Sequence, residues 1–103
     1  MKHVRFLLLL FFLSCKPETE LEKLGKHYQK NGDYQSLKQV VELMEMDVDT
    51  SFVKTILGEP ISMGFDFRYL ADSTSENGCT IGAVFHIGEA GKIDQKWIDE
   101  ICE

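Results

Sequence analysis

Cysteine is the residue type whose positions in this sequence most clearly suggest chemistry. The chain has 103 residues and three cysteines, Cys15, Cys79 and Cys102. A cysteine thiolate can act as a nucleophile, bind a metal or form one half of a disulfide. Cys79 and Cys102 do not form a Cys-x-x-Cys unit. His27 and His86 also lack the ligand spacing that would complete a zinc site. We therefore expect no metal and no cofactor.

The segment before Cys15 has the three parts of an export signal. Lys2 and Arg5 form a short positive stretch, residues 6–13 form an unbroken apolar run, and the small residue Ser14 precedes the cysteine. The apolar run has eight residues, which is too few for a membrane-spanning helix of about 20. The sequence therefore predicts a cleaved signal peptide at residues 1–14, a short tether at residues 15–19 and one domain at residues 20–103.

The end of this segment, Phe12-Leu13-Ser14-Cys15, resembles the lipobox read by the lipoprotein signal peptidase. The Cys15 thiolate would accept a diacylglyceryl group as a thioether before the peptide bond on its amino side is cut. Two or more acyl chains anchor a protein stably to a membrane. We therefore expect a lipoprotein signal peptide and a contact with the membrane through lipid on Cys15. The alternative is an ordinary secretory leader followed by a coincidental cysteine.

The residues after Cys15 indicate where the anchored domain lies. Lys16 replaces the aspartate that is associated with inner-membrane retention in enteric bacteria. The sequence therefore favours the outer membrane of the cell envelope, with the domain facing the periplasm. Glu18 and Glu20 also resemble the surface-export signals of some Gram-negative lipoproteins, which leaves the cell surface as an alternative.

With Cys15 assigned to lipid, Cys79 and Cys102 remain as an even pair. An exported domain of this size lies in an oxidising compartment, so we expect a disulfide between them. Closing a loop of about 24 residues would stabilise the fold by roughly 3 kcal/mol. In a regular hairpin in which Ile87 faces Ile93, however, Cys79 lies opposite Ile101, and Cys102 points to the other face. The bridge therefore requires a bulge, a frayed end or a final helical turn.

Other patterns typical of catalytic sites do not occur in the sequence. It has no nucleophile elbow, phosphate loop, dinucleotide fingerprint or His-Glu-x-x-His motif. Asp66 and Arg68 are two residues apart and predict a charge pair on one face of a strand. His86, between two apolar residues, is interpreted as a satisfied or half-exposed side chain and not as a general base. We expect neither an enzyme nor a small-molecule substrate.

The charge of the chain narrows the choice of partners. The full chain has a net charge of −6, and cleavage after Ser14 would leave 9 basic and 17 acidic residues, a net charge of −8. This balance disfavours nucleic acid, because nucleic-acid binding requires clustered Lys and Arg. An acidic, solvated surface is the main interpretation, and a basic protein partner is the alternative.

Helical periodicity precedes a strand-like period in the mature chain. Apolar residues at helical spacing predict helices over residues 20–30 and about 34–46. A third helix follows a cap at Asp49 or Thr50 and ends at Gly58, with Pro60 preventing its continuation. The period then changes to two, which predicts strands over residues 61–70, 79–87 and 92–101. We therefore expect an α+β fold with N-terminal helices packed on one face of a three-stranded antiparallel β-meander.

Two stretches of the chain resemble the SmpA/OmlA, or BamE-like, lipoprotein family. Asp49 to Pro60 looks like that family's helix ending in Leu-Gly-x-Pro, and Gly82 to Ile98 looks like its closing hairpin. Together they cover about half of the mature chain. The resemblance implies the fold shared with β-lactamase inhibitor proteins and a scaffolding role in outer-membrane β-barrel assembly.

A sheet covered by helices on one face leaves aromatic residues on its other face. Arg68, Tyr69 and Trp97 are of the types enriched at protein interfaces, and we predict that they contact a partner. The first hypothesis is a non-catalytic binding or scaffold module that contacts another envelope protein. The alternative is a periplasmic inhibitor or immunity protein that blocks an enzyme or toxin.

Overall fold

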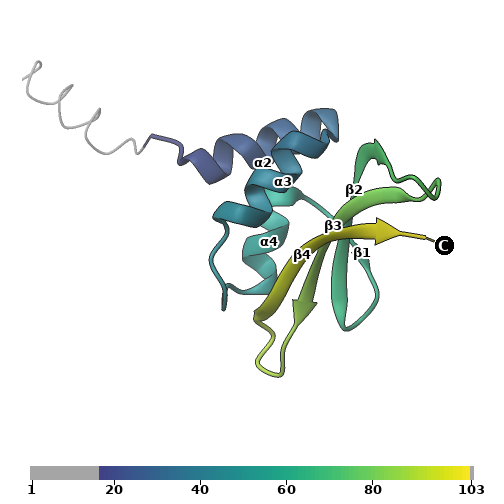
Figure 1. Cartoon of the computed structure of the whole chain (residues 1–103). Coiled ribbons are helices and arrows are strands. Elements are labelled where there is room, and N and C mark those ends of the chain that lie inside the picture. The colour runs from purple at the N-terminus through teal and green to yellow at the C-terminus, as the bar shows by residue number, and fades with distance from the viewer. Residues whose placement is uncertain (1–16, 103) are drawn as a thin grey trace, which may run out of the picture.

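The computed structural model describes residues 17–102. The predicted signal peptide and Cys15 lie outside the described residues. The helices come first in the chain and the strands follow, which confirms the expected α+β class (Figure 1). Within the described part, no helix combines the length and the apolar composition needed to span a membrane. The elements are α2 (Glu20–Asn31), α3 (Tyr34–Leu43), α4 (Thr50–Leu57), β1 (Ile61–Ser62), β2 (Asp66–Thr74), β3 (Thr80–Ile87) and β4 (Ile93–Ile101).

Local capping signals set the ends of the helices. The Thr19 hydroxyl accepts a hydrogen bond from the Glu22 N–H at 3.1 Å, and the Glu22 carboxylate accepts one from the Thr19 N–H at 3.0 Å. This capping box gives partners to N–H groups that a first helical turn leaves unpaired. Gly32 ends α2 in the left-handed region, with φ 65°. Asp33 then caps α3, which ends at Leu43, earlier than predicted.

The sheet has four antiparallel strands in the order β1-β2-β3-β4, which corrects the predicted three-stranded meander. The predicted strand over residues 61–70 folds back at Gly64, whose φ is 88°. β1 and β2 are the two arms of this turn, with Ile61 paired to Arg68. β2 also extends to Thr74, beyond the predicted end of the strand at residue 70. Apolar residues around the turn are exposed and not in the core: Ile61 at 43%, Met63 at 45% and Phe65 at 57%.

The pairing of β3 with β4 is interrupted by a bulge at Asp94. Ile87 lies opposite Ile93, as predicted, but the ladder then skips Asp94. A β-bulge of this kind adds one residue to one strand and shifts the pairs that follow. Trp97 therefore lies opposite Val84, whereas a regular hairpin in which Ile87 faces Ile93 would place it opposite Ala83.

The same bulge brings Cys79 and Cys102 together. Thr80 pairs with Ile101, so the next position on each strand is a cysteine. The Cα atoms of the two cysteines are 5.0 Å apart, which is within the range found for disulfides. Of the three devices that would allow this bridge, the chain uses the bulge.

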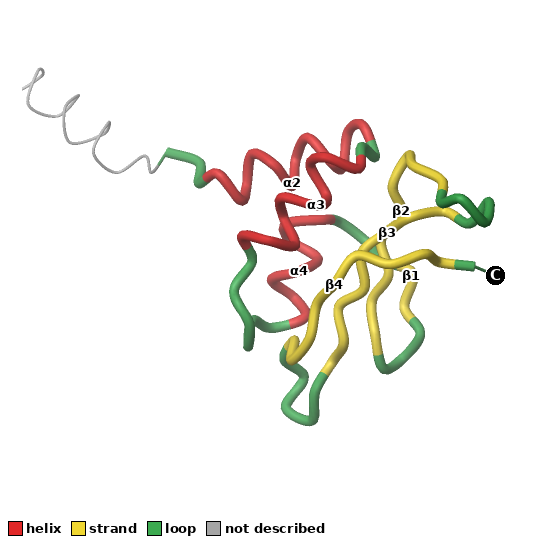
Figure 2. The backbone as a smooth tube through the Cα atoms, viewed as in Figure 1, coloured by secondary structure: helices red, strands yellow, loops and turns green. Residues whose placement is uncertain are grey.

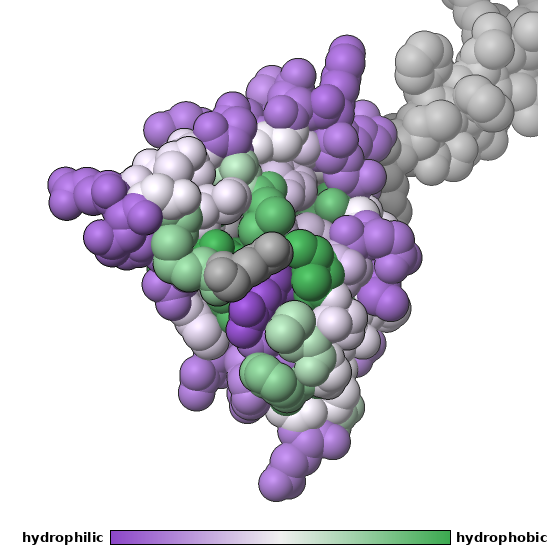
Figure 3. All heavy atoms as spheres, turned by 90° about the vertical axis from the view of Figure 1, so that its right-hand side faces the viewer, coloured by the Kyte–Doolittle hydropathy of each residue, from purple (hydrophilic) through white to green (hydrophobic). Residues whose placement is uncertain are grey.

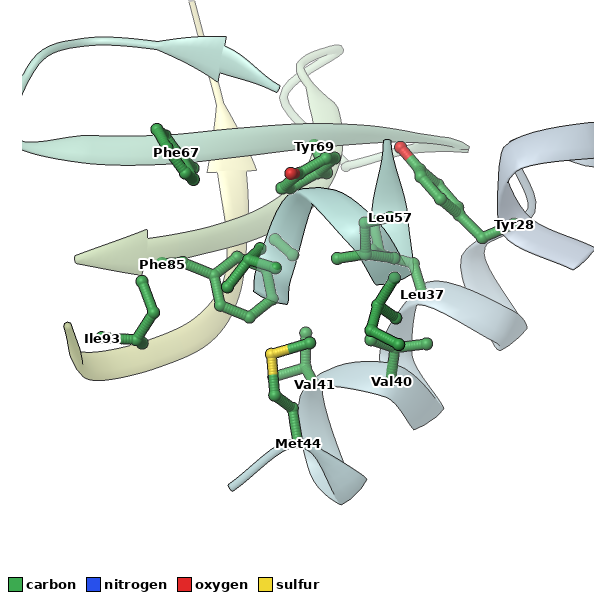
Figure 4. Close-up of a cluster of buried hydrophobic side chains, with 13 residues drawn as sticks. Tyr28, Leu37, Val40, Val41, Met44, Leu57, Phe67, Tyr69, Phe85 and Ile93 are labelled. Atoms are coloured by element: carbon green, nitrogen blue, oxygen red, sulfur yellow. The ribbon is translucent and has the colours of Figure 1, made fainter. Parts of the chain in front are cut away.

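The helices cover one face of the sheet, and the hydrophobic core lies between the two layers (Figure 2). Phe85 on β3 is fully buried in this core. Figure 4 shows Tyr69 between Phe85 and Tyr28. The ring centroids are 5.8 Å apart for Tyr69 and Phe85 and 6.3 Å apart for Tyr28 and Tyr69. The Tyr28 hydroxyl donates to the Leu70 carbonyl at 2.5 Å, which joins α2 to β2.

Candidate functional site

The candidate site is the face of the sheet that carries no helix, which we call the outer face. Successive residues of a strand point to opposite sides of a sheet. Because Phe67, Tyr69, Ala83 and Phe85 point into the core, the residues between them point outward. The outer face therefore carries every second residue of β2 and β3.

A row of four directly paired residues crosses this outer face, with one residue from each strand. Ile61 pairs with Arg68, Arg68 with Val84, and Val84 with Trp97. Trp97 and Ile61 are 36% and 43% exposed, whereas Val84 between the strands is only 5% exposed. Two predicted contact residues, Arg68 and Trp97, are thus brought to one row with an apolar floor.

Tyr69 does not belong to this row, and its predicted partner contact is corrected. Its side chain is 3% exposed and lies in the core beside Phe85. Its hydroxyl donates to the Gly58 carbonyl at 2.8 Å. Burial, with a smaller contribution from the negative charge of Glu59, raises the pKa of Tyr69 well above its usual value, so the hydroxyl remains a donor.

Further apolar residues lie beside the row, toward the end of the sheet that holds Cys79 and Cys102. A hollow of about 400 Å³ lies there, lined in part by Leu70, Ile101 and the two cysteines. Ile101 lies over Gly82, where an added Cβ would come within 2.8 Å of the Ile101 side chain. Figure 3 shows hydrophobic side chains gathered on this side of the molecule, with hydrophilic side chains around them.

Polar groups on the outer face are held by short-range contacts. The Arg68 Nε lies 3.3 Å from a carboxylate oxygen of the buried Asp66, which confirms the predicted charge pair. This contact uses Nε and does not involve the two Nη groups. The Trp97 Nε1–H donates to the Asp99 carboxylate at 3.1 Å. The guanidinium and the indole are therefore oriented by carboxylates on their own strands.

The half-exposed His86 has a carboxylate as its neighbour. Its Nδ1 lies 2.7 Å from an oxygen of Asp94, the residue that forms the bulge. Asp94 and the exposed Asp99 give β4 an acidic border beside the outer face. A partner that covers the outer face would meet negative charge along this border.

The outer edge of β4 has features that oppose the addition of another strand. Lys96 pairs with Phe85 on the helix-covered side of the sheet, and its Nζ donates to the Val41 carbonyl of α3. Inward-pointing charged residues and bulges are typical devices that protect sheet edges from pairing. The outer face, and not the β4 edge, is therefore the better contact surface.

A serine, a histidine and an aspartate meet where α2 joins α3, a cluster that the sequence analysis did not identify. The His27 Nδ1 lies 2.9 Å from an Asp33 carboxylate oxygen and 2.8 Å from the Ser36 hydroxyl. In a catalytic triad, one ring nitrogen of the histidine contacts the acid, and the other ring nitrogen contacts the nucleophile. Because both contacts here involve the same nitrogen, Nδ1, the arrangement is not that of a triad. It connects the end of α2 to the start of α3.

A group that could hold a metal lies beside the hollow. Ligand atoms of Cys79, Glu100 and Cys102 lie within 4.8 Å of one another. The two cysteines, however, are at disulfide distance, and a bridged sulfur is not a thiolate ligand. Glu100 also accepts hydrogen bonds from the Ser75 hydroxyl at 2.7 Å and the Asn77 amide at 3.2 Å. These contacts fasten the β2–β3 loop to β4.

Comparison with models of known protein families, with curated proteins and with solved structures found no match. The interpretation of the outer face therefore depends on its residues alone. Ile61 and Val84 were not predicted as part of it, because period-two alternation does not show which face a strand buries. The signal in the sequence that could have separated β1 from β2 is Gly64, since an isolated glycine in a strand pattern often marks a turn or bulge.

Proposed function

We propose that this protein is a lipid-anchored envelope protein that acts as a non-catalytic protein-binding or scaffold module through the outer face. The observation that supports this most directly is the row in which Arg68 and Trp97 flank the buried Val84. Arg and Trp are enriched among residues that dominate binding energy, and such residues act best over a desolvated apolar base. The row offers both components.

The sequence supplies the rest of this proposal. The leader at residues 1–14 and the lipobox ending at Cys15 support a membrane anchor, and Lys16 supports the outer membrane with the domain in the periplasm. The likeness to the BamE-like family makes another envelope protein, in outer-membrane assembly or maintenance, the proposed partner. The BamE-like form of the fold is part of the same proposal.

Site-specific photocrosslinking in cells tests the proposed contact. A photoreactive amino acid at position 97 should give one protein adduct, because Trp97 lies in the row. Position 52 is the matched control, since Phe52 is also aromatic and the two side chains are 38% and 36% exposed. The control should give no such protein adduct. Absence of an adduct from position 97, or the same adduct from both positions, would contradict the proposal.

Binding measurements with the captured partner test the energetic role of the row. Trp97→Ala should weaken the complex by about 2 kcal/mol or more, as is typical of tryptophan at a binding hot spot. Phe52→Ala should leave the affinity unchanged. Equal affinities for Trp97→Ala and the unaltered protein would exclude the row as the main contact.

The acidic border of β4 supports a second candidate, an inhibitor or immunity protein that blocks a basic enzyme or toxin. Asp94 and Asp99 are exposed beside the row, and exposed charge pairs weaken as salt screens them. The crosslinked adduct distinguishes the two functions. A component of the barrel-assembly machinery supports the scaffold, whereas a secreted hydrolase or toxin, bound less tightly at high salt, supports the inhibitor.

A further inference from the structure

We propose that a second apolar surface, on the helices, lies in the interface of the bilayer that holds the lipid on Cys15, and so fixes the orientation of the domain. This proposal depends on the lipid anchor of the proposed function. The new element is that defined side chains of the domain contact the membrane, in addition to the attachment through the tether. The occupant of this surface is a neutral phospholipid bilayer.

The surface, which we call the basal groove, lies between the start of α2, the end of α3 and α4. It encloses about 360 Å³, and its apolar lining comprises Leu21, Leu43, Val48, Phe52 and Ile56. Leu43 and Phe52 are 50% and 38% exposed, and the neighbouring Met46 is 44% exposed. Large apolar side chains that remain exposed in a group mark contact with a partner or a membrane.

The length of the tether places the basal groove near the bilayer. Thr19 caps α2 and also lines the groove, and Cys15 precedes it by four residues. Four extended residues span at most about 14 Å. Acyl chains on Cys15 begin at its sulfur, so the groove lies within roughly that distance of the lipid. The helices and the core lie between the start of α2 and the outer face of the sheet (Figure 1).

The charges around the basal groove indicate which lipid headgroups it can contact. Glu22 and Glu45 line it. Hydrogen bonds from the backbone and the hydroxyl of Thr19 lower the pKa of Glu22, so this carboxylate is ionised at neutral pH. Negative charge beside the apolar residues opposes an anionic membrane surface. A bilayer of zwitterionic lipids is therefore the surface that the groove matches.

Fluorescence quenching by brominated lipids tests this orientation in the full lipidated protein. Trp97 is the single tryptophan, so Trp97→Phe gives a background without tryptophan emission. In that background, Phe52→Trp places a reporter in the basal groove, and Phe65→Trp places one on the exposed turn between β1 and β2. The proteins are reconstituted in phosphatidylcholine vesicles with plain or brominated acyl chains, and flotation first confirms that they bind. Leu43→Trp is a second groove reporter that keeps the test valid if Phe52→Trp does not fold.

The groove reporter should lose at least about half of its emission in brominated vesicles, because interfacial helices bury apolar side chains roughly 5–10 Å into the boundary. The reporter at position 65 should lose little.

Equal quenching of both reporters, or of neither, in protein that floats with the vesicles would overturn the orientation while leaving the anchor intact. Blue-shifted emission from position 52 that does not respond to bromine would show that protein, and not lipid, covers the reporter, and would also overturn the orientation. Failure of the lipidated protein to float would contradict the anchor itself, and the proposal with it.

Discussion

At the scale of single residues, Asp33 shows how one carboxylate joins two helices. It accepts a hydrogen bond from the Ser36 N–H at 3.0 Å and contacts the His27 Nδ1 at 2.9 Å. Partial burial raises the pKa of Asp33, but the hydrogen bonds from Ser36 and His27 outweigh this effect and leave the pKa below its usual value. Asp33 therefore stabilises the fold at pH values above the pKa that its carboxyl group has in the unfolded chain. This contribution is lost as the pH falls through the lower pKa that the group has in the folded state.

Asp33→Asn should remove this acid-dependent contribution. Asparagine still caps a helix, so the free energy of unfolding near neutral pH should change little. The difference in unfolding free energy between neutral pH and about pH 3 should become smaller, because the titrating group is gone. Urea denaturation at the two pH values measures it. Asp33→Ala, which also removes the cap, should cost about 1 kcal/mol at neutral pH. An unchanged pH difference in Asp33→Asn would show that another group is responsible.

Residue types alone predicted part of the outer face. Arg68 and Trp97 lie on it, but Tyr69 follows Arg68 directly in β2, and adjacent strand residues point to opposite sides. The two could not share a face, whatever the strand's environment. Trp97 reaches the outer face only because of the bulge, since a regular hairpin places it on the side of Ala83, in the core. The partner contact of Trp97 stays a prediction, and its place on the outer face depends on a feature that the sequence does not mark.

At the scale of elements, the helices were easier to predict than the strands. α2 and α4 have their apolar residues at helical spacing and have glycine at the end, and both were found close to their observed bounds. These signals are local. The bulge and the turn at Gly64 depend on how one strand meets another, which alternation within a single strand does not specify. The number of strands was therefore wrong although the α+β class was right.

The ends of β3 and β4 carry the proposed disulfide. Thiol reagents should not label Cys79 or Cys102 before reduction, and should label both afterwards. Replacing both cysteines with serine should lower the free energy of unfolding by roughly 3 kcal/mol, the value expected for a closed loop of this size. Reduction of the unaltered protein should give the same loss and should not affect the double variant. Labelling without reduction would contradict the bridge.

At the scale of the whole molecule, the domain has two apolar surfaces on different sides. The basal groove lies beside the start of the described chain, and the outer face lies across the core from the helices (Figure 1). If the groove rests on lipid, the row with Arg68 and Trp97 faces away from the bilayer. The same core thus separates the proposed membrane contact from the proposed protein contact.

Cys15→Ala tests the membrane attachment on which this arrangement depends. Without the thiol, no thioether to diacylglycerol forms, and two or more acyl chains are lost. The variant should move from the detergent phase to the aqueous phase in a phase-partition experiment on whole envelopes. Cys102→Ala is the control, because it also removes one cysteine, and it should remain in the detergent phase. Detergent partitioning of Cys15→Ala would contradict lipidation of this residue.

The bulge at Asp94 also affects how genes for related proteins can vary. β4 contains one residue more than a regular pairing with β3 requires. Deletion of the Asp94 codon would close the bulge and leave every later pair in register. Deletion of a codon after Trp97 would move Cys102 out of line with Cys79 and exchange the faces of the residues that follow. Among homologous genes, we therefore expect single-codon length differences in this strand to occur at position 94 or beside it.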